Sequence, residues 1–260
     1  MGKYIYYNYG FSKEIKEKIN FIKQSGFDGV FLFCDRKTNK KLVNNLRNEK
    51  LEIETLHLPY RYMCNNLWVK GKRGEKYKDV IIKGIKKAKR LDIKTVIMHI
   101  SSSDCPPAYN SLGLERINEI LKYCEKYNII LALENLRRLD YLDYILENCN
   151  SKKLKFCFDS GHANAFTKNI NNFNWNKYKD KLHCVHLHDN NGLCDEHLLP
   201  FTGNIDWNKL MIDLNNINYS GNLTLEVIHN FDKDKIGSEK DFIEKAYKAI
   251  SKLEEMKKNG

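Results

Sequence analysis

Two apolar runs in the second half of the chain lead into side chains that bind metals. The first run, LKFCFDSGHAN, supplies Asp159 and His162, and the second, HCVHLHDNNGLCDEH, supplies His186, Asp195 and His197. A buried imidazole or carboxylate costs free energy unless it has a partner, so packing alone does not require this density of such groups. We interpret the stretch as half of a metal site.

The composition favours one large soluble domain. With 260 residues, of which 42% are hydrophobic, the chain can form a single core, and α/β barrels commonly use about 200 to 250 residues for one domain. We therefore expect residues 1–260 to form a single domain. The first residues lack the segments of a secretory signal, and no apolar run approaches the ~20 residues that span a bilayer, so we expect a cytoplasmic protein without a membrane partner. The eight cysteines are expected to be reduced core residues.

The formal charge of +11 is compatible with a nucleic-acid ligand or an anionic substrate. Most of this charge comes from lysine, however, and much of it falls at helical spacing in segments such as IKEKINFIK and KGIKKAKRL. A solvated helix face explains that pattern better than a binding surface does. The charge alone therefore leaves the class of ligand open.

Strand-like and helix-like segments alternate along the whole chain. The strand-like runs are Tyr4–Asn8, Gly29–Cys34, Glu52–Leu58, Thr95–Ile100, Ile129–Glu134, Lys155–Asp159, Cys184–His188 and Leu223–Ile228. The helical patterns are Lys13–Gln24, Lys37–Lys50, Glu75–Arg90, Ser111–Tyr127, Asp140–Asn150, Asn174–Lys181, Asp206–Asn216 and Ser238–Lys257. Ser12 and Asp206 can cap the first and seventh helices, and Gly26 can end the first. Eight such pairs predict a parallel sheet closed into a single (β/α)8 TIM barrel rather than an open sheet.

Functional side chains of such barrels lie at the carboxyl ends of the strands, and the last six predicted strands each end in, or close to, a metal-binding residue. These residues are His57, His99, Glu134, Asp159, His186 and Glu226, with His162, Asp195 and His197 in the following loops. Each alone is explained as a hydrogen-bonded core residue or a helix cap. Together they predict a divalent metal site at the carboxyl-terminal face of the barrel. The ion is of the Mn, Zn, Co or Fe type, because Ca²⁺ and Mg²⁺ favour all-oxygen shells.

Seven motifs resemble those of the xylose-isomerase-like barrel superfamily, which includes sugar-phosphate isomerases and epimerases, ketose 3-epimerases and endonuclease IV. The motifs are LHLPY, MHIS, LALEN, FDSGHAN, VHLHDNNGLCDEH, TGNIDW and LTLEV, and they span roughly Glu52 to Ile228. In the ketose 3-epimerases a Glu, an Asp, a His and a second Glu hold one divalent metal. Motif by motif, the resemblance places these ligands on Glu134, Asp159, His186 and Glu226. The two glutamates of that family also exchange the carbon-bound proton of the substrate, and His162 then contacts a substrate oxygen.

In endonuclease IV the same scaffold holds three zinc ions and hydrolyses the DNA backbone beside an abasic site. The resemblance gives its additional ligands to His57, His99, His162, Asp195 and His197. This set exceeds what one ion needs, and clustered ions suit phosphoryl transfer because they stabilise attacking and leaving oxygens together. The segment TGNIDWNKL and the turn PFTGN, in contrast, resemble the isomerase- and epimerase-like members more than the nuclease.

The loop after the third predicted strand, RYMCNNLWVKGKRGEK, has three interpretations. It can contact DNA through its basic and aromatic residues, which are Arg61, Tyr62, Trp68, Lys70, Lys72 and Arg73. It can equally form a substrate lid, in which Trp68 stacks on a sugar face and Arg61 meets a phosphate. It can also be a solvated surface loop.

The leading prediction is a metal-dependent isomerase or epimerase of a small sugar or sugar phosphate. It transfers protons through an enediolate, with Glu134 and Glu226 as acid and base groups and one bound ion. The alternatives are an endonuclease IV-like phosphodiesterase, with two or three ions and a nucleic-acid partner, and an inosose dehydratase-like lyase. A non-catalytic binding barrel leaves the cluster of ligands unexplained. The sequence leaves the identity of the sugar and the oligomeric state open.

Overall fold

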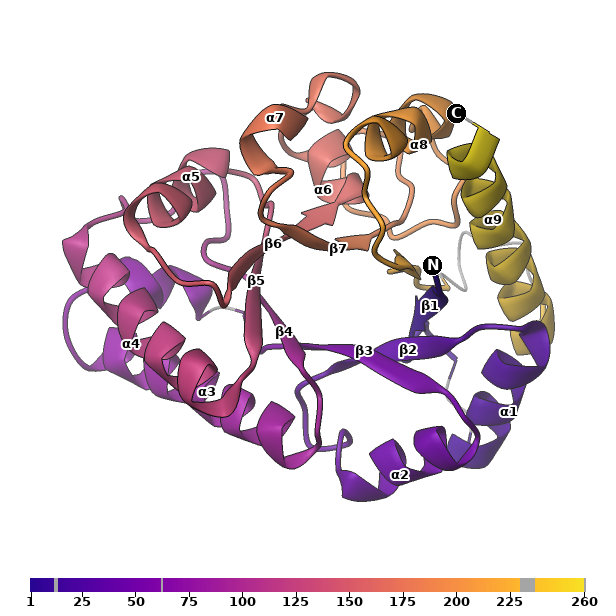
Figure 1. Ribbon diagram of the computed structural model, residues 1–260, viewed down its shortest axis with the longest axis horizontal. Coiled ribbons are helices and arrows are strands. Elements are labelled where there is room, and N and C mark those ends of the chain that lie inside the picture. Colours follow the sequence, from indigo (N-terminus) through magenta and orange to yellow (C-terminus); the bar gives the residue numbers. More distant parts are fainter. Residues whose placement is uncertain (12–13, 62, 230–236, 260) are drawn as a thin grey trace.

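The computed structural model describes residues 1–11, 14–61, 63–229 and 237–259. In these residues eight strands form one sheet, and the paired strands run parallel. The strands are β1 Lys3–Tyr6, β2 Gly29–Phe33, β3 Glu52–His57, β4 Thr95–Met98, β5 Ile130–Glu134, β6 Leu154–Asp159, β7 Leu182–His186 and β8 Leu223–Leu225. Figure 1 shows the strands as an inner ring with the helices around it, so the predicted (β/α)8 barrel is confirmed.

The sheet closes between its two terminal strands, β7 and β8. Just beyond β7, Leu187 forms an isolated parallel bridge with Leu225. The backbone N–H of Leu187 donates to Thr224 O at 2.8 Å, and that of Glu226 donates to Leu187 O at 3.1 Å. Backbone bonds thus join the two edges of the sheet, and the carboxyl ends of the strands surround one mouth.

Several of the helices between the strands begin or end at recognisable caps. They are α1 Ile15–Ser25, α2 Lys40–Asn48, α3 Lys72–Arg90, α4 Ser111–Tyr127, α5 Leu139–Asn148, α6 Ser160–Ala165, α7 Trp175–Tyr178, α8 Trp207–Asn216 and α9 Glu239–Asn259, with the 3₁₀ turns η1 Cys64–Trp68 and η2 Ile170–Asn172. Gly26 ends α1 in the left-handed region at a φ of 100°, and the Asp206 side chain caps α8 by accepting from Lys209 N at 3.0 Å. Both predicted caps are confirmed, whereas Ser12 lies outside the described residues.

None of the helices in the described ranges is long and apolar enough to cross a membrane.

Small apolar side chains form a layer inside the barrel below the predicted ligands. The members of this layer are Ile97, Ala132, Cys157 and Cys184, which are at most 2% exposed. Each lies two residues before a predicted ligand, namely His99, Glu134, Asp159 and His186. Because side chains along a strand alternate between its two faces, the ligands point into the barrel above this layer.

The differences from the predicted elements that bear on the site concern two strands and two helices. Strands β4 and β8 are shorter than predicted, so His99 and Glu226 each follow their strand by one residue instead of lying within it. The last residues of β4 pair with its two neighbours, Ile97 with His57 of β3 and Met98 with Leu133 of β5. Helix α6 is not predicted from the sequence, and the predicted helix 174–181 contracts to the single turn of α7.

The cysteines are free, as predicted, but they are not all in the core. Five of them are buried and Cys34 is partly buried, whereas Cys105 and Cys194 are exposed. These two lie in loops, where no apolar strand or helix face covers them. The prediction that the cysteines form no disulfides is therefore confirmed, whereas the prediction that they lie in the core is wrong for Cys105 and Cys194.

Candidate metal centre

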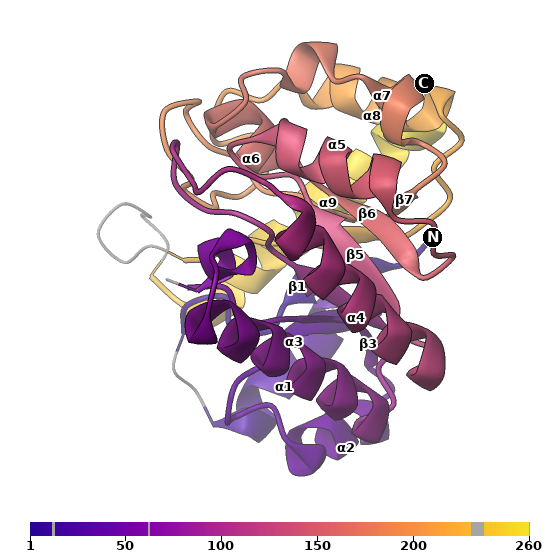
Figure 2. The same ribbon diagram turned by 90° about the vertical axis from the view of Figure 1, so that its left-hand side faces the viewer.

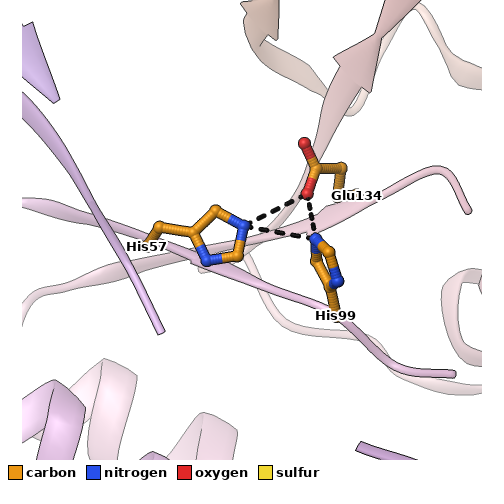
Figure 3. Close-up of side chains that lie close together, drawn as sticks. All are labelled: His57, His99 and Glu134. Atoms are coloured by element: carbon orange, nitrogen blue, oxygen red, sulfur yellow. Dashed lines mark hydrogen bonds and ion pairs between the residues drawn. The ribbon is translucent and has the colours of Figure 1, made fainter. Parts of the chain in front are cut away.

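His57, His99 and Glu134 converge inside the mouth from three neighbouring strands (Figure 3). His57 Nε2 lies 3.2 Å from His99 Nε2 and 3.3 Å from Glu134 Oε2, and His99 Nε2 lies 2.5 Å from the same oxygen. All three side chains are buried. Imidazole nitrogen and carboxylate oxygen are ordinary ligands of Zn²⁺ and similar ions, so this first group has the composition of a coordination shell.

A second group shares Glu134 with the first. Glu134 Oε1 lies 2.7 Å from His186 Nδ1, and Glu226 Oε2 lies 2.5 Å from the same nitrogen. Asp159 completes the second group, because one ligand atom from each of the four residues lies within 4.8 Å of the others. The structure therefore brings together the four ligands predicted for a single ion, and the two oxygens of Glu134 face different groups.

The loop after β7 brings a third group to the rim of the mouth. Asp195 Oδ2 lies 3.2 Å from His197 Nε2 and 3.4 Å from His162 Nε2. The side chains of Asp195 and His197 are 25% and 20% exposed, so this group is closer to solvent than the other two. Every ligand predicted from the sequence thus belongs to one of three adjoining groups.

His188 is not among the predicted ligands, yet it joins this cluster. Its Nε2 lies 3.1 Å from both carboxylate oxygens of Asp159 and 3.7 Å from Asp195 Oδ1. The motif HLHD contains the signal that could have identified it, because His188 follows His186 by two residues and the predicted strand Cys184–His188 places both on one face.

Backbone carbonyls orient three of the imidazoles. His57 Nδ1 lies 3.0 Å from Leu58 O, His162 Nδ1 lies 2.9 Å from Asn135 O, and His197 Nδ1 lies 2.8 Å from Glu226 O. A carbonyl oxygen only accepts, so Nδ1 carries a proton in each ring, and Nε2 is the nitrogen that can offer a lone pair to the site when the ring is neutral. Contacts of this kind are typical of metal-binding histidines, in which they fix the tautomer and the ring orientation.

Asn135, just after β5, and the first turn of α6 hold Asp159 in place. Its Oδ1 caps α6 by accepting from His162 N at 2.6 Å. The Asn135 side chain accepts from Asp159 N at 2.7 Å and donates to Asp159 O at 2.8 Å. The motif FDSGH therefore forms a helix start as well as supplying ligands, and this cap explains the helix that the sequence does not predict.

Burial and mutual contact shift the ionisation of these groups. Burial by itself raises the pKa of Glu134, but His186 and His99 outweigh it and hold this pKa well below its usual range. Burial likewise opposes ionisation of Glu226, and His186 lowers its pKa to about 2. Burial disfavours charge on His186, yet Glu226 and Glu134 raise its pKa well above the usual value. In the absence of ions, pairs of carboxylate and imidazolium therefore carry the charge of the site.

The residues fit divalent ions of the Zn²⁺ or Mn²⁺ type. Carboxylates from β5, β6, β8 and the loop after β7 lie in one cluster, where like charges repel one another unless cations lie between them. Asp195 Oδ1 is buried and has no hydrogen bond within the described part of the chain, which leaves a charged oxygen for a ligand. The mixture of nitrogen and oxygen donors matches transition metals better than Ca²⁺ or Mg²⁺.

An open cavity leads from solvent to these groups. His197 and Glu226 line it together with Tyr6, Tyr60 and Arg61. Tyr60 also packs on the ring of His99, with 4.0 Å between the centroids. Arg61, one of the three predicted substrate residues, therefore lies at the cavity, and its role in binding stays a prediction.

Trp68, another predicted substrate residue, lies away from this cavity. It is 3% exposed, and its Nε1 donates to Ile100 O at 2.7 Å. Its ring packs on Gly113 of α4, where a Cβ would lie 2.1 Å from Trp68 Cε3. Figure 2 shows α3 and α4 side by side on this face of the barrel. The predicted stacking of Trp68 on a sugar is therefore wrong, because the ring belongs to the core.

The rest of the predicted lid is an ordered segment. Arg116 of α4 is 2% exposed, and its Nη1 donates to Leu67 O in η1 at 2.7 Å and to Val69 O just after η1 at 2.8 Å. Lys72 and Arg73 begin α3 rather than a loop, and Lys70 is exposed just before them. Tyr62 lies outside the residues that the structure describes.

Residues 19–246 match the sequence profile of a family described as xylose isomerase-like TIM barrel. The chain belongs to this family. The resemblance indicated by the motifs is thus confirmed at the level of the family.

Three relatives illustrate the range of similar sequences. The uncharacterized protein MJ1614 of Methanocaldococcus jannaschii is 33% identical over 139 residues, which cover 50% of this chain and 53% of that protein. The uncharacterized protein MJ1311 of the same organism is 27% identical over 232 residues, or 79% of this chain and 76% of that protein. A protein named probable endonuclease 4, from Mycoplasma mycoides subsp. mycoides, is 26% identical over 139 residues, or 46% and 47% of the two chains. The chain thus spans about half the length of MJ1614 and of the endonuclease in these matches.

Solved structures with the same fold include several epimerases. D-psicose 3-epimerase from Clostridium cellulolyticum H10 superimposes with a TM-score of 0.80 at 16% sequence identity, covering 99% of both chains. A D-tagatose 3-epimerase-like protein superimposes with a TM-score of 0.75 at 22% identity, covering 100% of this chain and 99% of that one. At such identities the similarity establishes the fold alone.

Proposed function

We propose that the protein is a multi-metal phosphodiesterase that cleaves nucleic acid at abasic sites. The observation that carries this proposal is the first ligand group, in which Nε2 of His57 and Nε2 of His99 lie 3.3 and 2.5 Å from Glu134 Oε2. A single-ion centre uses only the second group and leaves these two buried imidazoles without a role. The third group, with Asp195 and His197, extends the cluster toward solvent. This proposal reverses the order of the two functions predicted from the sequence.

One further observation supports a nucleic-acid substrate, and a second is compatible with it. The relative from Mycoplasma mycoides that aligns with 26% identity over 139 residues is named a probable endonuclease 4. The formal charge of +11 is compatible with such a substrate but does not select it, because much of the charge falls at the spacing of solvated helix faces. Neither observation alone selects abasic sites, which enter through the resemblance to endonuclease IV.

The residues around the cavity divide the work of binding and positioning. Glu134 holds the first and second groups next to each other, while Glu226 and His197 face the incoming substrate from the cavity wall. Arg61 offers a guanidinium that pairs with a phosphate through two parallel hydrogen bonds. Tyr60 packs on His99 and keeps that ring in place. When bound, clustered divalent ions supply Lewis-acid stabilisation to the attacking and leaving oxygens of a phosphodiester.

Epimerisation of a sugar is the second candidate, and one observation favours it. Glu134 and Glu226 contact the same nitrogen of His186, at 2.7 and 2.5 Å. Two carboxylates beside one ion are the arrangement that the resemblance to ketose 3-epimerases predicts for proton exchange through an enediolate. The epimerases among the structural neighbours are consistent with this candidate through their fold.

A duplex with one abasic site, compared with the same duplex without it, tests the proposal. We expect the protein loaded with Zn²⁺ or Mn²⁺ to cut only the abasic duplex, and to lose this activity on chelation and in Glu134→Gln. Glu119→Gln makes the same chemical change on the half-exposed Glu119 side chain of α4 and serves as the control. An uncut duplex, together with uptake of deuterium from heavy water at a ketose carbon, would overturn the proposal in favour of the epimerase.

A further inference from the structure

His188 touches two of the three ligand groups. It is fully buried, and its Nε2 lies 3.1 Å from each carboxylate oxygen of Asp159, a member of the second group. Its ring stacks on that of His197 in the third group, with 4.2 Å between the centroids and 22° between the planes. His188 therefore connects a ligand of the central cluster with a ligand at the rim.

The ring geometry argues against an ion shared by His188 and His197. Ligand atoms of His188, Asp195 and His197 lie within 4.8 Å of one another, so distance alone would allow a shared ion. The lone pair of an imidazole nitrogen, however, lies in the plane of its ring, and two stacked planes only 22° apart do not meet close to the rings. An ion about 2.0 to 2.1 Å from both nitrogens would lie well outside at least one ring plane. His197 and His188 are therefore poorly placed to share an ion.

The neighbours of His188 assign its proton to Nε2. Two carboxylate oxygens face that nitrogen, and an N–H group can meet both of them without repulsion. Nδ1 is buried and has no hydrogen-bond partner among the residues that the structure describes. In this tautomer the ring donates to Asp159, and Nδ1 is left as an unsatisfied acceptor rather than an unsatisfied donor.

The first turn of α6 holds His188 in this position. Ser160 Oγ donates to His188 O at 2.9 Å and accepts from His188 N at 3.0 Å. Gly161 lies against the imidazole, since a Cβ at this position would be 1.9 Å from His188 Cε1. The serine and glycine of FDSGH therefore fit the second histidine of HLHD, and the two metal-binding motifs interlock through this ring.

We propose that His188 is a positioning residue, which fixes the carboxylate of Asp159 and the ring plane of His197 and thereby couples the second and third ligand groups. The inference rests on the metal centre of the proposed function, and it is independent of the substrate. Loss of a partner that orients metal ligands typically lowers metal affinity or activity about 10- to 100-fold. Because His188 contacts members of two groups, loss of each contact is expected to weaken the binding of the ion in the corresponding group.

Two substitutions separate these contacts. His188→Gln keeps an N–H group within reach of Asp159 and removes the ring that stacks on His197, whereas His188→Phe keeps a ring and removes the donor. We expect both variants to bind as many Zn²⁺ ions as the wild type at saturation. His188→Gln lowers the affinity of the third group for its ion, and His188→Phe lowers that of the second group, each about 10- to 100-fold. Competition with a chromophoric chelator and the visible spectrum of the Co²⁺-loaded protein measure these affinities without nucleic acid.

The matched control is His183→Gln, because His183 lies on β7, the strand that leads to His188, and contacts Thr95 Oγ1 at 3.1 Å instead of the ligand groups. Loss of one whole equivalent of Zn²⁺ at saturation in His188→Gln would identify His188 as a ligand and overturn the proposal. Unchanged Zn²⁺ affinities in His188→Gln would also overturn the proposal. The His188→Gln result is sufficient for this test even if His188→Phe does not fold. A protein that binds ions in the expected way and leaves abasic DNA uncut refutes the proposed function alone.

Discussion

Glu134 meets His99 at 2.5 Å through Oε2 and turns its other carboxylate oxygen toward a different ligand group. With ions bound in both groups, this carboxylate would contribute to two coordination shells. Loss of Glu134 would then affect two ions, whereas loss of a terminal ligand such as His99 would affect one. This difference makes the number of ions in the centre measurable by mutation.

Glu134→Gln is expected to remove more than one equivalent of bound metal. The amide offers one neutral oxygen in place of two charged ones, so the first and second groups both lose a ligand. Metal analysis after removal of free ions measures the loss, and Glu119→Gln on α4 should retain the wild-type content. A loss of no more than one equivalent would indicate a single-ion centre and contradict the multi-metal proposal.

His99→Asn separates the two candidate functions. This change removes a ligand of the first group and leaves Glu134, Asp159, His186 and Glu226 of the second group in place. Because a catalytic ion supplies several kcal/mol of transition-state stabilisation, the phosphodiesterase should lose at least ~100-fold in kcat. A single-ion epimerase should keep its metal and its rate of proton exchange. Assays of both reactions with the same protein preparation distinguish the two outcomes.

Trp68→Ala is expected to destabilise the fold by about 3 to 5 kcal/mol, the usual range for removal of a buried tryptophan side chain. The indole fills the space over Gly113 and donates to Ile100 O, so its loss leaves both a cavity and an unpaired carbonyl. Urea unfolding measures the change, with Leu193→Ala at a side chain that is 78% exposed as the control. Unchanged stability combined with weaker substrate binding would instead support the interpretation of this loop as a substrate lid.

Trp68 also shows where sequence reasoning reaches its limit. The barrel and most of its ligands are predictable because strand ends and alternate residues fix which side chains share the mouth. The residues that contact the Trp68 ring, in contrast, are Gly113 of α4 and Tyr141 of α5, and no local pattern reports those contacts. The loop composition, rich in basic and aromatic residues, fits a lid and a buried segment equally well.

His188 is a different kind of omission. Its position two residues after His186 places it on the ligand face by the same alternation that identifies Asp159 and Glu134. The sequence does not reveal the stacking of His188 on His197. That contact depends on how the loop after β7 folds back toward the end of the strand, which no local pattern predicts. The composition of the site is therefore more predictable than the contacts that orient it.

The binding of ions is expected to release protons and to strengthen as the pH rises. Burial lowers the pKa of His197 in the metal-free protein, but Asp195 outweighs burial and raises this pKa from 6.5 to about 9. Burial also opposes charge on His162, whose pKa Asp159 and Asp195 raise well above the usual value. An ion binds only the neutral imidazole, so below about pH 9 it must displace the proton of His197. The apparent affinity of the third group therefore increases with pH up to that value and levels off above it.

Calorimetric titration with Zn²⁺ in two buffers of different protonation enthalpy measures the number of protons released. His197→Gln removes one titrating ligand and should release fewer protons, while His183→Gln, away from the cluster, should match the wild type. Equal affinities at neutral pH and near pH 9 would contradict the expectation, because they would mean that His197 is already neutral before the ion binds. In that case the ion pair between Asp195 and His197 would not compete with metal, and the third group would bind its ion as tightly at neutral pH as in alkaline solution.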